Sequence, residues 1–221
     1  MKKLTLLHMG DSITFGQYVD PALRWSSLVA NEIRDRTAGA FELTSVNHGI
    51  SGETTRMGLE RYPKDVQEVG AHVQTLQFGM NDCNCWQTDH GLPRVSERAF
   101  RANFHEMIAR SRRFNVAKLI LMTNPRSLRV SALPSGEPYD DANARYSAII
   151  REIAKEEGLP LCDIRAAFDT LSPATLTDYL LPAPDLLHLS PAGNRFYADT
   201  IFPYIQQAIN ELIPSFEAAP L

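Results

Sequence analysis

Five short apolar runs alternate along the chain with longer segments in which apolar residues recur at helical spacing. Strands buried on both faces of a parallel sheet are expected to be nearly continuous apolar runs, and the candidate runs cover residues 4–9, 41–47, 73–78, 118–123 and 159–164. The helical patterns cover residues 21–36, 54–69, 96–114, 139–157 and 191–212. This alternation predicts right-handed crossover connections, and therefore a parallel sheet with helices on both faces.

Length and composition fit one globular domain. The 221 residues are 44% hydrophobic and 22% charged, which is ordinary for a soluble protein. We predict a single domain over residues 1–214, followed by a loose tail at 215–221. The formal net charge of −4 leaves no basic stripe to neutralise phosphates, so a nucleic-acid partner is not expected.

Neither export, a membrane span nor a metal site is indicated. No apolar run approaches the roughly 18 residues of a membrane span, and Met1-Lys2-Lys3 precedes only about six apolar residues, too few for a secretory signal. We therefore expect a cytoplasmic protein. Cys83, Cys85 and Cys162 lack the spacing of a zinc site, so we expect neither a structural disulfide nor a metal.

The first apolar run ends at Gly10-Asp11-Ser12-Ile13-Thr14, where a strand is expected to turn into a helix. A serine at this position lies at the carboxyl edge of the sheet, beside the first free amides of the helix. Such amides carry the positive end of the helix dipole and can stabilise an oxyanion. Aspartate and serine are also common helix caps, so the motif alone has a structural interpretation as well.

Three further polar blocks follow in order. Asn47-His48-Gly49 ends the second run, Gly79-Met80-Asn81-Asp82 ends the third, and Asp185-Leu186-Leu187-His188 lies close to the C-terminus. With these four blocks the chain resembles the SGNH subgroup of the GDSL esterases and lipases over almost its whole length. The resemblance implies an α/β fold: a three-layer α/β/α sandwich whose five-stranded parallel sheet has the flavodoxin-like order 2-1-3-4-5.

The resemblance also implies a serine hydrolase that acts on ester bonds without a cofactor. Ser12 would be the nucleophile, His188 its general base, and Asp185 the residue that orients His188. The oxyanion hole would consist of the backbone amides of Ser12 and Gly49 and the side-chain amide of Asn81.

Three other motifs are interpreted structurally. Gly49-Ile50-Ser51-Gly52-Glu53 lacks the second glycine of a nucleophile elbow, and Gly52 is assigned to a simple turn. His105-Glu106 begins like a zinc-protease helix, but Ala109 stands where the second histidine belongs. His8 lies inside the first strand and is expected to be a core histidine.

The long segments 83–96 and 124–138 are expected to determine substrate specificity, because loops at strand ends usually do. We expect substrate contacts from Asp11, Ile50, Met80, Trp86, His90, Arg126 and Leu187. The polar character of the two segments favours a small-molecule ester with a short acyl group, such as acetyl on a carbohydrate.

Three alternatives stay open. A lysophospholipase or an acyl thioesterase would use the same catalytic residues. A non-catalytic binding protein on this fold would show damage to the catalytic set, and the whole set is present. A flavodoxin-like cofactor binder would need a Gly-x-Gly-x-x-Gly turn after the first strand, and Gly10 and Gly16 do not supply one.

Overall fold

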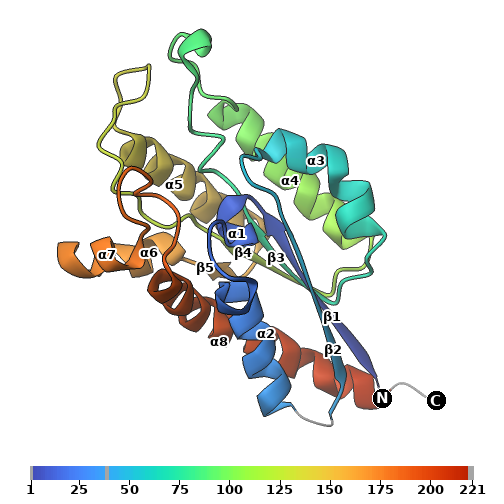
Figure 1. Ribbon diagram of the computed structural model, residues 1–221. Coiled ribbons are helices and arrows are strands. Elements are labelled where there is room, and N and C mark those ends of the chain that lie inside the picture. The colour runs from blue at the N-terminus through green and yellow to red at the C-terminus, as the bar shows by residue number, and fades with distance from the viewer. Residues whose placement is uncertain (1, 38–39, 219–221) are drawn as a thin grey trace.

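The computed structural model describes residues 2–37 and 40–218. A five-stranded parallel sheet lies between two layers of helices (Figure 1). The strands are β1 (Lys3–Gly10), β2 (Glu42–Gly49), β3 (Val73–Gln77), β4 (Lys118–Met122) and β5 (Leu161–Cys162). Their order in the sheet is β2-β1-β3-β4-β5, so the predicted fold class and strand order are confirmed.

The helices divide between the two faces of the sheet. The longer ones are α2 (Trp25–Arg36), α3 (Thr55–Tyr62), α4 (Glu97–Arg113), α5 (Tyr139–Glu157) and α8 (Pro191–Ala218). On one face α4 packs between α3 and α5, and on the other α2 packs against α8 (Figure 1). The short helices are α1 (Ser12–Phe15), α6 (Ile164–Asp169) and α7 (Pro173–Tyr179). Within the described residues, no helix is both long and apolar enough to cross a membrane.

The central strands are buried, and β3 buries the polar residues Gln74, Thr75 and Gln77 together with its apolar ones. Every residue of β3 is buried, as are the last five residues of β1, because helices cover both faces of these central strands. His8 is among them: it contacts Thr75 Oγ1 at 2.9 Å and packs on Trp25, and burial lowers its pKa to about 3. The prediction that His8 is a core histidine is confirmed.

The register of the sheet gathers three strand ends at one edge. Gly10 at the end of β1 lies opposite Gly49 of β2 on one side and Gln77 of β3 on the other. The segments that follow these strands therefore leave the same edge of the sheet together. These are the segments that contain Ser12, Gly52 and Asn81.

Two element boundaries differ from the prediction. α8 continues to Ala218, so residues 215–218 are helical rather than a tail, and residues 219–221 lie outside the described part. The predicted strand at 159–164 shortens to Leu161–Cys162, because Asp163 caps α6 by accepting the N–H of Ala166 at 3.1 Å.

Candidate active site

Ser12 is the first residue of α1, immediately after the buried strand β1. Asp11 caps this short helix, since its Oδ1 accepts the N–H of Ile13 at 2.9 Å. The N–H of Ser12 makes no hydrogen bond to any described residue, as expected for a group at a helix start. Ser12 is 7% exposed, and it lines a cavity at the carboxyl edge of the sheet.

The side chains of Ser12, His188 and Asp185 form a hydrogen-bonded line. His188 Nε2 lies 2.9 Å from Ser12 Oγ, and His188 Nδ1 lies 2.8 Å from Asp185 Oδ2. Partial burial opposes ionisation of Asp185, but hydrogen bonds from His188 and from the N–H of Leu187 hold its pKa below the ordinary value. An ionised carboxylate can only accept, so Nδ1 carries the ring proton and Nε2 can accept the hydroxyl proton of Ser12.

Gly49 does not reach the cavity, contrary to the prediction that its amide belongs to the oxyanion hole. Its N–H donates to Asn47 Oδ1 at 2.9 Å, and a Cβ at this position would collide with the backbone of Phe15. Asn47 also donates through Nδ2 to the carbonyl of Thr14 at 2.7 Å. The absence of a side chain at Gly49 therefore lets β2 pack closely against α1, which is a structural role.

Gly52, rather than Gly49, has the place beside Ser12 and Asn81 that the sequence analysis gave to the glycine of the oxyanion hole. It lines the same cavity as Ser12 and Asn81, and within the described chain its N–H has no hydrogen-bond partner. Its φ is 79°, and no atom lies within 4 Å of a Cβ built on it, so close packing does not explain this glycine. Asn81 Nδ2 donates one proton to the carbonyl of Glu53 at 2.9 Å, which leaves its second N–H for the cavity.

Arg61 of α3 connects the segments that surround these donors. Its guanidinium donates to the carbonyls of Gly10 at 3.3 Å and His48 at 2.8 Å, and to the carboxylate of Glu53 at 2.6 Å. Burial raises the pKa of Glu53, and the bond from Arg61 opposes that rise. The Arg61 guanidinium therefore holds the ends of β1 and β2 together and also holds Glu53, whose carbonyl fixes Asn81. These bonds preorganise the site.

Asp11 precedes Ser12 and is fully buried, so the prediction that it binds substrate is wrong. Its Oδ2 lies 3.5 Å from Gln77 Nε2, which also donates to Asn124 Oδ1 at 2.5 Å. Burial raises the pKa of Asp11 to about 7. The residue therefore supports α1 from within the core.

Replacing Asp11 by asparagine should reduce the pH dependence of stability. A carboxyl whose pKa is raised from 3.8 to about 7 on folding adds stability that is fully present below pH 3.8 and is lost as the pH rises to about 7. Between pH 5 and pH 8 this loss amounts to about 2–3 kcal/mol. Urea unfolding at the two pH values should show that much less change in the variant than in the wild type.

The exposed Asp35→Asn variant on α2 is the control, and it should keep the wild-type pH dependence of the free energy of unfolding. Equal dependence in Asp11→Asn and the wild type would show that burial does not hold Asp11 protonated.

The cavity has a volume of about 390 Å³ and contains three of the predicted substrate-binding residues, which are Met80, Trp86 and Leu187. Trp86 is 54% exposed at the rim. The wall also contains residues that the sequence analysis did not assign to the substrate: Gln17, Tyr18, Ser51, Gly52, Asn84, Arg129 and Tyr139. The ring of Tyr18 meets His188 edge-on, with 5.4 Å between the ring centroids.

Three predicted substrate contacts lie outside this wall. Ile50 is exposed beside it, and His90 follows the short turn Gln87–Asp89. Arg126 faces Asp140 at 3.5 Å and Asp169 at 3.6 Å. Within the described residues, no three histidine, cysteine, aspartate or glutamate side chains gather as ligands for a metal ion.

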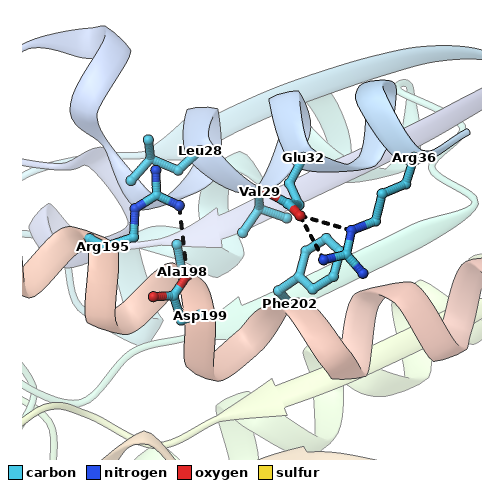
Figure 2. Close-up of a pocket in the computed structure, with 8 residues that line it drawn as sticks. All are labelled: Leu28, Val29, Glu32, Arg36, Arg195, Ala198, Asp199 and Phe202. Carbon is cyan, nitrogen blue, oxygen red and sulfur yellow. Dashed lines mark hydrogen bonds and ion pairs between the residues drawn. The ribbon is translucent and has the colours of Figure 1, made fainter. Parts of the chain in front are cut away.

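A second hollow, of about 130 Å³, lies between α2 and α8 (Figure 2). Its charged side chains pair with one another, Arg36 with Glu32 at 2.7 Å and Arg195 with Asp199 at 3.6 Å. Arg36 also covers the ring of Phe202. The described lining of this hollow contains no nucleophile with an adjacent base, so we assign the chemistry to the cavity around Ser12.

Comparison with known proteins shows the family to which the chain is similar. The model of the GDSL-like Lipase/Acylhydrolase family matches residues 8–196. Thioesterase 1/protease 1/lysophospholipase L1 of Escherichia coli (strain K12) is 26% identical over 210 residues, which cover 93% of this chain and 85% of that protein.

Solved structures show the same similarity. The lipase/acylhydrolase from Enterococcus faecalis has a TM-score of 0.73 at 28% identity, and the match covers 94% of this chain and 96% of that one. An acetylxylan esterase from Geobacillus stearothermophilus has a TM-score of 0.71 at 26% identity, with 91% and 94% covered.

Proposed function

The chain belongs to the GDSL-like lipase/acylhydrolase family, and on this premise we propose that it hydrolyses carboxylic esters of short acyl groups on polar alcohols. The observation that carries the proposal is the line from Ser12 Oγ through His188 to Asp185, with contacts of 2.9 and 2.8 Å. This geometry supplies a nucleophile, a base and a group that orients the base, so the reaction needs no cofactor.

In the first half of the reaction, Ser12 Oγ attacks the carbonyl carbon of the ester while His188 Nε2 takes the hydroxyl proton. The carbonyl oxygen becomes an oxyanion, which the N–H groups of Ser12 and Gly52 and the free N–H of Asn81 stabilise. His188 then returns the proton to the departing alcohol oxygen. The products of this half are the alcohol and an acyl group on Ser12.

In the second half, a water molecule takes the place of the alcohol. His188 removes its proton as the water oxygen attacks the acyl carbon, and the same donors stabilise the second oxyanion. The bond to Ser12 Oγ breaks, and His188 returns the proton to that oxygen. The free acid leaves and the enzyme is restored.

The wall of the cavity supports a short acyl group and a polar alcohol. The wall contains the amide and hydroxyl side chains of Gln17, Ser51 and Asn84 as well as the apolar side chains of Met80 and Leu187. The acetylxylan esterase among the related structures makes acetyl groups on carbohydrate the first substrates to test.

A lysophospholipase or an acyl thioesterase is the alternative within the same chemistry. It is supported by the related Escherichia coli protein, which carries both of those names. The exposed rings of Trp86 and Tyr18 at the rim are the structural features that an acyl chain could cover.

A series of p-nitrophenyl esters from acetate to decanoate should separate these alternatives. Each methylene that meets an apolar wall gains about 0.8 kcal/mol. We expect kcat/KM to stop rising at butyrate, because the cavity wall contains polar as well as apolar side chains. A steady several-fold rise per methylene to octanoate would instead favour the lipid or thioester substrate.

A further inference from the structure

Arg129 lies at the active site without an acidic partner. Arg126, three residues earlier in the same loop, faces Asp140 at 3.5 Å and Asp169 at 3.6 Å. No carboxylate of the described residues lies within ion-pairing distance of Arg129. Its Nε instead donates to the backbone carbonyl of Asp185 at 2.9 Å.

Arg129 lines the cavity that contains Ser12 and His188. Its Cζ lies 5.8 Å from the centroid of the Tyr139 ring, and the Tyr139 hydroxyl is fixed on the carbonyl of Met80 at 2.8 Å. The bond from Nε occupies one edge of the planar group. Nη1 and Nη2 make no hydrogen bond to any residue that the structure describes, so their N–H groups can serve a ligand.

No acidic side chain in the described wall of the cavity neutralises this charge. Apart from Arg129 itself and His188, the polar wall residues of the cavity carry uncharged amides and hydroxyls. Asp185, whose carbonyl Arg129 binds, directs its carboxylate at His188 instead. A guanidinium whose two terminal nitrogens are free binds a carboxylate through two parallel hydrogen bonds.

We propose that Arg129 is an anion subsite of the catalytic cavity, and that the preferred substrates are short acyl esters of alcohols that carry a carboxylate, such as hydroxy acids and sugar acids. This inference rests on the proposed function and narrows its alcohol from polar to anionic. Ser12 would attack the acyl group while Arg129 holds the carboxylate of the alcohol.

The test compares 4-acetoxybenzoate with the neutral 4-acetoxybenzamide. Removal of Arg129 in Arg129→Met should lower the ratio of kcat/KM for the charged ester to that for the neutral one by about 10–100-fold, mainly through KM. Arg129→Lys should keep part of the preference because it keeps the charge. Arg126→Met, which removes an ion-paired arginine from the same loop, should leave the ratio at the wild-type value.

The ratio separates specificity from a merely structural role. Loss of the bond between Arg129 and the Asp185 carbonyl would displace His188 and slow both esters equally, leaving the ratio unchanged. An unchanged ratio in Arg129→Met, with the neutral ester still hydrolysed through Ser12, would refute the anion subsite and leave the esterase function intact.

If the wild type hydrolyses neither ester, the proposed function fails. The anion subsite is then tested by measuring the affinity for a carboxylate. Calorimetric titration of Ser12→Ala with 4-hydroxybenzoate should give a Kd at least about tenfold lower than that of the Ser12→Ala/Arg129→Met double variant. Equal Kd values would overturn the inference.

Discussion

Replacing Ser12 by alanine should lower kcat for p-nitrophenyl acetate by on the order of 10⁵–10⁶-fold, because the variant has no oxygen with which to form the acyl-enzyme. The protein should still fold, since the removed hydroxyl contacts the cavity and His188 rather than the core. A fluorophosphonate should add its mass to the wild-type peptide that contains Ser12. The alanine variant should not be labelled.

Ser51→Ala is the matched control. Ser51 lines the same cavity, but its hydroxyl hydrogen-bonds to Gln17 and not to a histidine. We expect this variant to be labelled at Ser12 and to keep most of its turnover. Labelling at Ser51, or turnover that survives in Ser12→Ala, would show that the nucleophile has been misassigned.

Replacing Asn81 by alanine should lower kcat by about 10²–10³-fold with a much smaller change in KM, because an oxyanion donor acts on the transition state. This corresponds to about 2.7–4 kcal/mol of transition-state stabilisation. Part of the decrease in kcat should come from the loss of the hydrogen bond that Asn81 donates to the carbonyl of Glu53. Steady-state kinetics with a short-chain ester measures both parameters.

Asn84→Ala removes a neighbouring amide from the same wall and serves as the control. The Oδ1 of Asn84 accepts the N–H of Cys85 at 2.9 Å, so this oxygen shapes the loop. We expect kcat to change by less than about tenfold in this variant. A loss in kcat for Asn81→Ala no larger than that would exclude Asn81 as an oxyanion donor.

The parts of the fold that follow from local pattern were predictable. Strands that helices cover on both faces are rich in apolar residues, so the runs that became β1 and β4 were recognisable before the structure. β3 is also fully buried, although Gln74, Thr75 and Gln77 are polar.

The prediction made the last strand too long. An apolar residue such as Ile164 fits a buried strand as well as a helix, and in the structure it begins α6. The side chain of Asp163, which accepts the N–H of Ala166, decides between the two elements.

The candidate site was predictable where the interacting residues belong to one sequence motif. It was not predictable where residues far apart in the sequence determine which group reaches the cavity. Asp185 and His188 are three positions apart, so their pairing is local. The choice between Gly49 and Gly52 depends on the backbone of Phe15, which closes around Gly49 from a different segment. No single-sequence pattern contains that contact.

The two arginines of the 124–138 segment make the same point. The sequence analysis assigned Arg126 to the substrate and left Arg129 unassigned, although both lie in the same segment. Asp140 and Asp169 face the first, and these partners come from α5 and α6. Only the tertiary structure shows which arginine is left without an acidic partner at the cavity.

The two segments that enclose the cavity are attached to the catalytic groups in different ways, and this has an evolutionary consequence. Arg94 joins segment 83–96 to the carbonyl of Gly52 at 2.9 Å, whereas Leu128 and Arg129 in segment 124–138 donate to the backbone carbonyls of Leu186 and Asp185. Insertions in the first segment can diversify substrate choice without moving the histidine. Changes in the second must be selected together with residues 185–188, so the lineage can explore new alcohols more freely from one side of the cavity than from the other.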